Sequence, residues 1–160
     1  MSTRERDIHF LKQAITLSRK GMQGGKGGPF GCVIVKGHEI IGEGYNRVTS
    51  TNDPTAHAEV VAIRDACARI GSFQLTDCEI FCSCEPCPMC LGAIYWARPL
   101  RVVYANTRQQ AASIDFDDSF IYEQIEKDFE ARSIPFEHIA LEEAAMVLEE
   151  WKKMPDKIRY

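Results

Sequence analysis

The sequence predicts a layered α/β fold in which helices cover both faces of a single sheet. Segments rich in β-branched and aromatic residues alternate along the chain with segments whose apolar residues recur at helical spacing. The 160 residues contain no internal repeat and no linker, so residues 1–160 are expected to form one domain around one core. Apolar residues make up 45% of the chain and charged residues 26%, a balance typical of soluble globular proteins.

The first helix is expected over about residues 4–21. Ser2 and Glu5 have the spacing of a capping box at its start. The glycine-rich stretch 21–28 ends the helix and lacks the Lys-Ser or Lys-Thr pair of a phosphate-binding P-loop, so it is interpreted as a mobile turn. The apolar residues that recur on one helical face are Ile8, Leu11 and Ile15.

Five strands are expected. The first two form a hairpin around a turn at Gly37 and His38. The fifth is the weakest of the five. The five segments are 30–36, 39–45, 79–84, 102–104 and 136–140.

Further helices are expected between and after these strands. One begins near His57, and another follows Pro86 and Pro88, which are tolerated in a first helical turn, and ends at Pro99. Apolar residues surround most of this second helix, which therefore should be buried. Two more helices are expected over 119–129 and 142–153. The residues expected to point inward from the helix near His57 are Val60, Val61, Ile63, Cys67 and Ile70.

The net charge and the cysteine content limit the classes of partner and the cellular compartment that suit this chain. The net charge of −4 lacks the basic excess of proteins that hold long nucleic acids, so a small neutral substrate is favoured. No apolar run reaches the roughly 18 residues of a membrane span, and the N-terminus lacks the apolar core of a secretory signal. Seven cysteines, four of them within residues 82–90, favour metal binding in a reducing cytoplasm over disulfides.

Two segments carry the chemistry. His57-Ala58-Glu59 is followed, 30 positions after His57, by Cys87-Pro88-Met89-Cys90, the H-x-E and P-C-x-x-C pattern of zinc-dependent deaminases. Cys87 and Cys90 lie three apart at a helix start, where both sulfurs share one side and the helix dipole favours thiolates. With His57 as the third ligand, the fourth tetrahedral position stays open, as catalytic zinc requires.

Glu59 is expected to move protons rather than hold metal. Residues two apart on a helix point to different sides, so Glu59 is a poor ligand beside His57. It can take a proton from the attacking water and deliver it to the ring and then to departing ammonia. Zinc favours this step because it lowers the pKa of the water it holds toward ~7.

The competing interpretation is a structural zinc knuckle without chemistry, formed by Cys82, Cys84, Cys87 and Cys90. Four ligands within nine residues require very tight folding, and this interpretation leaves His57 and Glu59 without a role. The residues outside the proposed site are expected in the core (Cys32, Cys67, Cys78, Cys82 and Cys84) or in surface or structural positions (His9, His38 and His138).

With these residues in place, the chain resembles the cytidine deaminase superfamily and, within it, the bacterial guanine deaminases. The zinc-binding segments mark the superfamily, whereas the Tyr95-Trp96 pair and the segment 116–122 mark the guanine branch. The likeness covers most of the chain and rests on the segments 27–31, 52–59, 83–98 and 116–122.

The resemblance implies a cytidine deaminase-like three-layer α/β/α fold with a five-stranded mixed sheet. It also implies one Zn²⁺ per subunit and a homodimer whose C-terminal segment is exchanged between subunits. The activity implied is the hydrolytic deamination of guanine to xanthine and ammonia, a reaction of purine catabolism and salvage. No nucleic acid and no membrane is expected as a partner.

The resemblance further implies substrate-binding roles for residues to which the sequence alone would assign only structural roles. It implies that Asn46 hydrogen-bonds the purine and that Phe30 and Trp96 pack around its ring. Asp118 is expected to reach the amidine edge of the substrate and assist the proton relay, and Tyr160 to help close the pocket. From the residues alone, Asn46 is a turn residue, Phe30 and Trp96 are core residues, and Asp118 is a helix cap.

One position departs from the pattern. The family usually has glycine where this chain has Asp115, so the loop that leads to Asp118 gains a charge and loses backbone freedom.

Three other functions compete with guanine deamination. A guanosine deaminase shares almost every motif and differs in having room for ribose. A tRNA adenosine deaminase shares the zinc chemistry, but the acidic balance and the absence of a basic C-terminal helix count against it. A non-catalytic zinc module is the rival from a different class.

Overall fold

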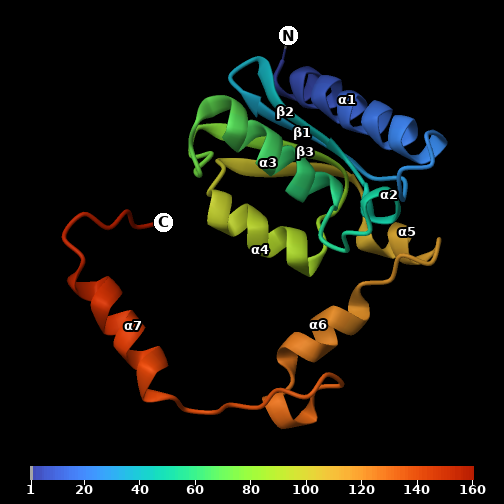
Figure 1. The fold of residues 1–160 in the computed structure, drawn as a ribbon. Coiled ribbons are helices and arrows are strands. Elements are labelled where there is room, and N and C mark those ends of the chain that lie inside the picture. The colour runs from blue at the N-terminus through green and yellow to red at the C-terminus, as the bar shows by residue number, and fades with distance from the viewer. Residues whose placement is uncertain (1) are drawn as a thin grey trace. The chain divides into compact units, whose positions relative to one another are not determined.

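The computed structural model describes residues 2–160, and the chain divides into two compact units, one up to Asp118 and one over Ser119–Tyr160. The first unit contains the sheet (Figure 1). Its elements are α1 (Thr3–Gln23), β1 (Gly31–Lys36), β2 (Glu39–Tyr45), α2 (Val48–Thr51), α3 (Ala58–Ile70), β3 (Cys78–Cys84), α4 (Pro88–Ala97), β4 (Arg101–Asn106) and α5 (Arg108–Ala112).

The sheet is mixed and has the strand order β2-β1-β3-β4. β1 pairs antiparallel with β2 and with β3, whereas β3 and β4 are parallel. The parallel pair needs a crossover, which α4 provides. Helix α1 covers one face, and α3 and α4 cover the other (Figure 1), so the three-layer prediction is confirmed for this unit.

The predicted fifth strand is wrong. Within residues 2–160 the sheet has four strands, and residues 136–140 form neither strand nor helix. These residues belong to the second unit and are exposed, Phe136 by 56% and Ile139 by 70%. A strand depends on a hydrogen-bonded neighbour and a covered face, which a local alternation of apolar residues does not supply.

Helix α1 packs on the sheet through Phe10 and, opposite Gly31, through small residues. Its capping box between Ser2 and Glu5 is present, as predicted. The buried face carries Phe10, Ala14, Ser18 and Gly21, whereas two of the three residues expected there, Ile8 and Ile15, are exposed by 43% and 37%. The reason is distance: a Cβ placed on Gly31 of β1 would lie 2.1 Å from the Ala14 carbonyl oxygen, so at this point of the contact larger side chains do not fit between helix and sheet.

Helix α3 packs equally closely on the other face. Ala58, Ala62 and Ala66 are buried. The five residues expected to point inward are only partly buried, and among them Ile63, Cys67 and Ile70 pack against the core. The buried core on this face includes Cys32, Ile34, Ile41, Leu75, Cys78, Ile80, Cys82, Ile94 and Ala97.

Helix α4 is less buried than its apolar sequence predicts. Only Cys90, Ile94 and Ala97 are buried. Tyr95 and Trp96 are exposed by 74% and 63%. An exposed run of large apolar residues on a helix is typical of a surface that a partner covers.

An ion-pair cluster joins the start of α1 to the starts of β3 and β4. The Arg101 guanidinium donates to both carboxylate oxygens of Asp7, at 2.9 and 2.7 Å, and to Glu79, which also pairs with Arg6. The hydrogen bond from Arg101 lowers the pKa of Asp7. The cluster therefore stabilises the contact between α1 and the sheet while its carboxylates are ionised.

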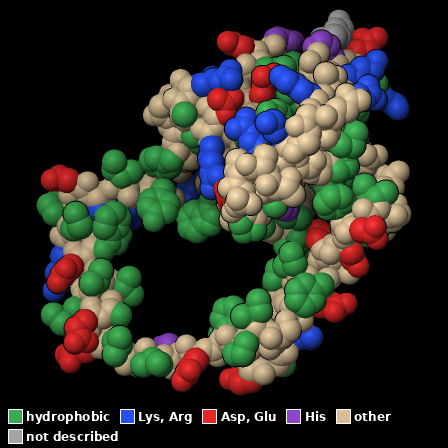
Figure 2. Space-filling model, turned by 45° about the vertical axis from the view of Figure 1, so that its right-hand side comes forward, with side chains coloured by type: hydrophobic (Ala, Val, Ile, Leu, Met, Phe, Trp, Pro, Cys, Tyr) green, Lys and Arg blue, Asp and Glu red, His purple; other side chains and the backbone are tan. Residues whose placement is uncertain are grey.

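The second unit contains α6 (Ser119–Glu126), a 3-10 turn (Phe129–Ala131) and α7 (Glu142–Lys153). The predicted helix over 142–153 is confirmed, and the one over 119–129 ends three residues early. None of residues 119–160 is buried, and hydrophobic side chains stand exposed along both helices (Figure 2). Within residues 2–160, none of the helices combines the length and apolar character that a membrane span requires.

Candidate metal and catalytic site

The candidate metal site lies where the first turns of α3 and α4 meet. His57 is the N-cap of α3 and Cys87 is the N-cap of α4, and neither side chain caps its own helix. Cys90 follows in the first turn of α4. His57 Nδ1 lies 3.4 Å from Cys87 Sγ and 3.5 Å from Cys90 Sγ. The sequence prediction that these three residues come together is therefore met by the structure.

The geometry fits zinc. The three ligand atoms lie within 4.8 Å of one another. A tetrahedral ion with Zn–S of about 2.3 Å and Zn–N of about 2.0 Å sets its ligand atoms about 3.5 Å apart, which matches both nitrogen–sulfur distances. His57, Cys87 and Cys90 could thus hold the ion with little movement.

The ionisation of the ligands also suits a divalent cation. The hydrogen bond from Cys90, opposed by burial and aided by His57, lowers the pKa of Cys87 to about 4. That same hydrogen bond and burial raise the pKa of Cys90, and the bond to Cys87 raises the pKa of His57. Cys87 is therefore the thiol that ionises more readily, and a cation between the two sulfurs favours the loss of the proton from Cys90 as well.

Glu59 lies beside this group, not in it. The residue is 7% exposed, and its Oε2 accepts from Cys90 Sγ at 3.3 Å. Burial raises the pKa of the Glu59 carboxyl, which brings it nearer to the range where a group both takes and gives protons. The structure places the predicted proton carrier next to the predicted metal ligands.

The remaining cysteines and histidines lie elsewhere. Cys84 is buried at the end of β3 and its Sγ donates to the Thr107 carbonyl at 3.7 Å, while Cys82 faces Cys32 at 3.9 Å. Over residues 2–160, the His57, Cys87 and Cys90 group is the one cluster whose atoms could share a metal ion, so the four-cysteine alternative is not formed. Cys32 and Cys78 are buried as predicted and Cys67 is half-buried, whereas His9, His38 and His138 are exposed.

Asn46, at the end of β2, is held in one orientation. Its Oδ1 accepts from the backbone N–H of Gly28 at 3.3 Å and of Val48 at 3.2 Å. The side-chain nitrogen of this 5%-exposed residue is then left as a donor. Since no side-chain nitrogen or oxygen in the described part of the chain is both fully buried and unpaired, Nδ2 reaches accessible space.

Two glycines that were interpreted as part of a mobile turn in fact support Asn46 and an aromatic pair. A Cβ on Gly27 would lie 2.2 Å from Asn46 Oδ1, and one on Gly28 would lie 2.8 Å from the Phe116 ring. That ring meets Phe30 edge-on, with centroids 4.9 Å apart. Phe116 was not among the predicted site residues, although it directly precedes the acidic pair in the chain.

Asp118 lies within the electrostatic reach of the metal ligands. Burial, and after it the negative charge of Cys87, raise the pKa of its carboxyl. The loop that leads to it contains Asp115, which takes a left-handed backbone conformation with φ of 69°. The position where the family usually has glycine therefore does use the conformation that favours glycine.

Comparison with known proteins identifies the family. The model of the cytidine and deoxycytidylate deaminase zinc-binding region matches residues 4–106. The chain belongs to this family. Its deaminase signature includes all three candidate ligands and Glu59, and the first unit of the structure contains the matched residues.

Individual deaminases are similar over nearly the whole chain. Guanine deaminase from Bacillus subtilis (strain 168) is 56% identical over 151 residues, which cover 94% of this chain and 97% of that protein. The X-ray structure of guanine deaminase from Bacillus subtilis superposes with a TM-score of 0.94 and 53% identity, covering 100% and 99% of the two chains. A tRNA-specific adenosine deaminase from Aquifex aeolicus is 32% identical over the same coverage.

Two predicted site residues of this deaminase are not brought to the metal ligands within the first unit. Trp96 lies nine residues after Cys87 on α4, about 13 Å along the helix axis at 1.5 Å per residue. Tyr160 belongs to the second unit. The roles of both residues stay predictions.

Proposed function

We propose that this chain is a zinc-dependent guanine deaminase that converts guanine and water to xanthine and ammonia. The observation that carries the proposal is the buried Glu59 carboxyl, which lies beside Cys90, one of the three residues that could hold zinc. The identity of 56% to a guanine deaminase supports the choice of base.

Glu59 is the proton carrier in this proposal. When bound, zinc supplies Lewis acidity that makes a water molecule nucleophilic at neutral pH. Glu59 Oε2 takes the proton that this water loses and passes it to the ring nitrogen beside the carbon under attack. After the water oxygen has bonded to that carbon, Glu59 takes its second proton as the oxygen becomes the new carbonyl of xanthine. It delivers this proton to the amino group, whose bond to carbon breaks to release ammonia. The raised pKa of Glu59 suits a group that must change its protonation state twice.

Asn46 and Asp118 are proposed to orient the purine. Because Asn46 Oδ1 is already occupied by two backbone N–H groups, its Nδ2 would donate to an acceptor atom of the base. The carboxylate of Asp118 would accept from the N1–H and amino groups of guanine, which form a donor-rich edge. The Phe30 and Phe116 rings, 4.9 Å apart, are placed to limit how far the ring can shift.

The test is turnover of three substrates by the zinc-loaded protein: guanine, guanosine and a tRNA anticodon stem-loop. We expect xanthine and ammonia from guanine and at least a hundredfold lower kcat/KM on the other two. Turnover of guanosine that is faster than that of guanine would mean that the pocket admits ribose. Inosine formed in the stem-loop would mean that the chain deaminates RNA.

The second unit is proposed to belong to a homodimer in which the C-terminal segment covers a second copy, so that each complete deaminase domain combines parts of two chains. Residues 119–160 have no buried residue, and they expose Phe120, Ile125, Leu148 and Trp151 by 44–71%. Apolar helices of this kind are stable only when another surface covers them. The exposed Tyr95 and Trp96 of α4 are apolar surface of the same kind.

Mixed dimers test the exchange. One chain lacks residues 155–160 and the other carries Glu59→Gln, and each homodimer is expected to be nearly inactive. If the tail acts on the partner, the mixed dimer regains activity at the site that has an intact Glu59 and receives the intact tail. If the tail acts on its own chain, mixing restores nothing.

The compartment proposed is the cytoplasm. The metal site needs Cys87 and Cys90 as free thiols, and all seven cysteines are free in the structure. A reducing environment maintains that state.

A further inference from the structure

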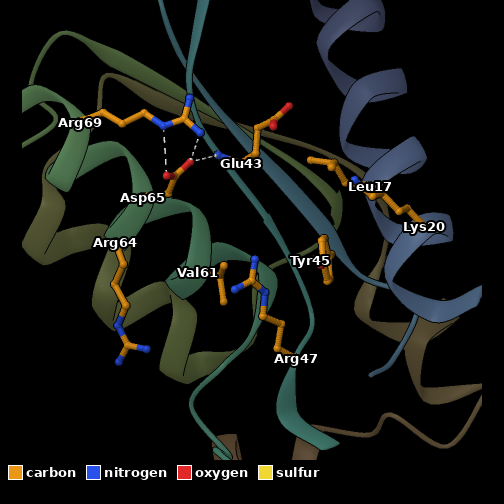
Figure 3. Close-up of a pocket in the computed structure, with 9 residues that line it drawn as sticks. All are labelled: Leu17, Lys20, Glu43, Tyr45, Arg47, Val61, Arg64, Asp65 and Arg69. Atoms are coloured by element: carbon orange, nitrogen blue, oxygen red, sulfur yellow. Dashed lines mark hydrogen bonds and ion pairs between the residues drawn. The ribbon is translucent and has the colours of Figure 1, made fainter. Parts of the chain in front are cut away.

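A hollow of about 560 Å³ lies at the β2 edge of the first unit, between α1 and α3. It is separate in composition from the proposed guanine site, because none of the residues that line it is a proposed metal ligand or purine contact. Figure 3 shows the residues around it: Lys20 on α1, Tyr45 at the end of β2, Arg47 just after it, and Arg64 and Arg69 on α3, with Arg69 turned onto Asp65.

The lining is rich in positive charge. Residues 1–118 contain 13 basic and 13 acidic residues, so a cationic surface here is not a property of the whole unit. The cations of the lining outnumber its carboxylates by two: Lys20, Arg47, Arg64 and Arg69 against Glu43 and Asp65.

Internal pairing leaves part of this charge available. Asp65 is occupied, since it accepts from Arg69 at 3.0 and 2.8 Å and from the Glu43 backbone N–H at 3.0 Å. Arg64 has a loose pair with Asp53 at 3.7 Å. In the part of the chain that the structure describes, Lys20 and Arg47 form no ion pair.

The hollow also offers a flat and apolar side. The Arg47 guanidinium lies over the Tyr45 ring, 4.9 Å from its centroid, and Leu17 and Val61 line the space beside it. A guanidinium held in this way can bind phosphate oxygens through its edge, and its face can stack on a planar group. The volume lies within the range of small-molecule pockets and far exceeds one phosphate ion.

We propose that this hollow binds a nucleoside diphosphate or triphosphate. Lys20 and Arg47 hold the phosphate groups, with Arg64 within reach of a further phosphate. The base and sugar lie against Leu17, Val61 and the stacked Arg47. The ligand is chemically distinct from guanine, which carries no phosphate.

The test is titration calorimetry of ADP into the zinc-loaded full-length protein at low ionic strength. ADP is chosen because its adenine base keeps it apart from the guanine site. We expect saturable binding at least tenfold tighter than that of adenosine or inorganic phosphate. Adenosine lacks the phosphates that the cations would bind, and inorganic phosphate lacks the base and sugar. Glu59→Gln is expected to leave ADP binding unchanged, so the two proposals can fail separately.

Two variants locate the site. Lys20→Gln and Arg47→Gln are each expected to weaken ADP binding at least tenfold. Arg4→Gln and Lys12→Gln, which remove cations from exposed positions of α1 outside the hollow, are expected to weaken it less than twofold. The proposal is overturned if ADP does not bind saturably, if all four variants bind alike, if inorganic phosphate binds as tightly as ADP, or if a single-stranded oligonucleotide binds more tightly.

Discussion

Replacing Gly27 with alanine tests whether Asn46 orients the substrate. The added Cβ would lie 2.2 Å from the side-chain oxygen Oδ1 of Asn46 and 2.7 Å from the backbone carbonyl oxygen of the same residue. Ordinary contact begins near 3.4 Å, so the amide has to move by about 1 Å. Misplacing a positioning group by this distance costs ~100-fold in rate.

The assay is kcat/KM on guanine, with melting temperature and zinc content measured on the same preparation. We expect Gly27→Ala to lose about two decades in kcat/KM and to keep its zinc. The control is Gly24→Ala, in the same glycine-rich stretch, whose Cβ would come no nearer to any of its neighbours than 3.1 Å, the distance to the Lys20 carbonyl oxygen. It should stay within threefold of the wild type.

A double variant separates positioning from general damage. If Gly27 acts mainly through the Asn46 side chain, adding Gly27→Ala to Asn46→Ala costs less than Gly27→Ala costs the wild type, because only the contact with the Asn46 backbone remains. Losses that multiply in the double variant, or a folded Gly27→Ala protein with wild-type turnover, would refute the reasoning.

Four further outcomes are expected. Glu59→Gln should retain one zinc per chain and lose at least ~10³ in kcat, since each proton transfer contributes ~10²–10⁴; metal loss would instead make it a ligand. By metal analysis, Cys90→Ala should lose zinc and activity together while Cys84→Ala, whose sulfur faces Thr107, keeps both. Asp115→Gly should raise the free energy of unfolding by about 1 kcal/mol by relieving a left-handed conformation, and an unchanged or lower melting temperature counts against that strain. Arg101→Met should cost about 1.5–3 kcal/mol at neutral pH, measured by denaturant unfolding.

The Arg101 variant also has a pH signature. Because Arg101 holds the pKa of Asp7 below its ordinary value of 3.8, this stabilisation is complete above that pH and is lost as pH falls through the lowered pKa. The difference in stability between wild type and Arg101→Met should therefore shrink below about pH 4. A difference that is constant across this range would show that the charges contribute nothing.

The metal site could be predicted from the sequence because its geometry is local. Cys87 and Cys90 occupy the first turn of one helix, and His57 directly precedes another, so helix periodicity alone orients two of the three ligands. The association of Gly27 with Asn46, and of Gly28 with Phe116, depends on contacts across 19 and 88 residues. Such long-range contacts cannot be predicted from the spacing of residue types along the sequence.

The buried faces of α1 and α3 were mispredicted for a related reason. Periodicity of branched residues favoured Ile8 and Ile15, whereas the sheet admits Ala14 and Ser18 because Gly31 brings the backbones together. The contact at Gly31 requires small side chains, and a hydrophobic pattern in the sequence does not indicate side-chain size. The false strand at 136–140 has no neighbouring strand in the described residues, and strand pairing is a property of the whole fold.

The hydrogen bond from the Glu43 backbone to Asp65 has a consequence for self-association. β2 is an edge strand, and the outward N–H groups of such a strand are a template on which another chain can add a strand and start a fibril. Asp65 occupies one of these donors from α3, and its ion pair with Arg69 holds the carboxylate in place. The charged Asp65 side chain thus occupies a backbone N–H with which an incoming strand would pair. The edge therefore resists aggregation without any loss of β structure.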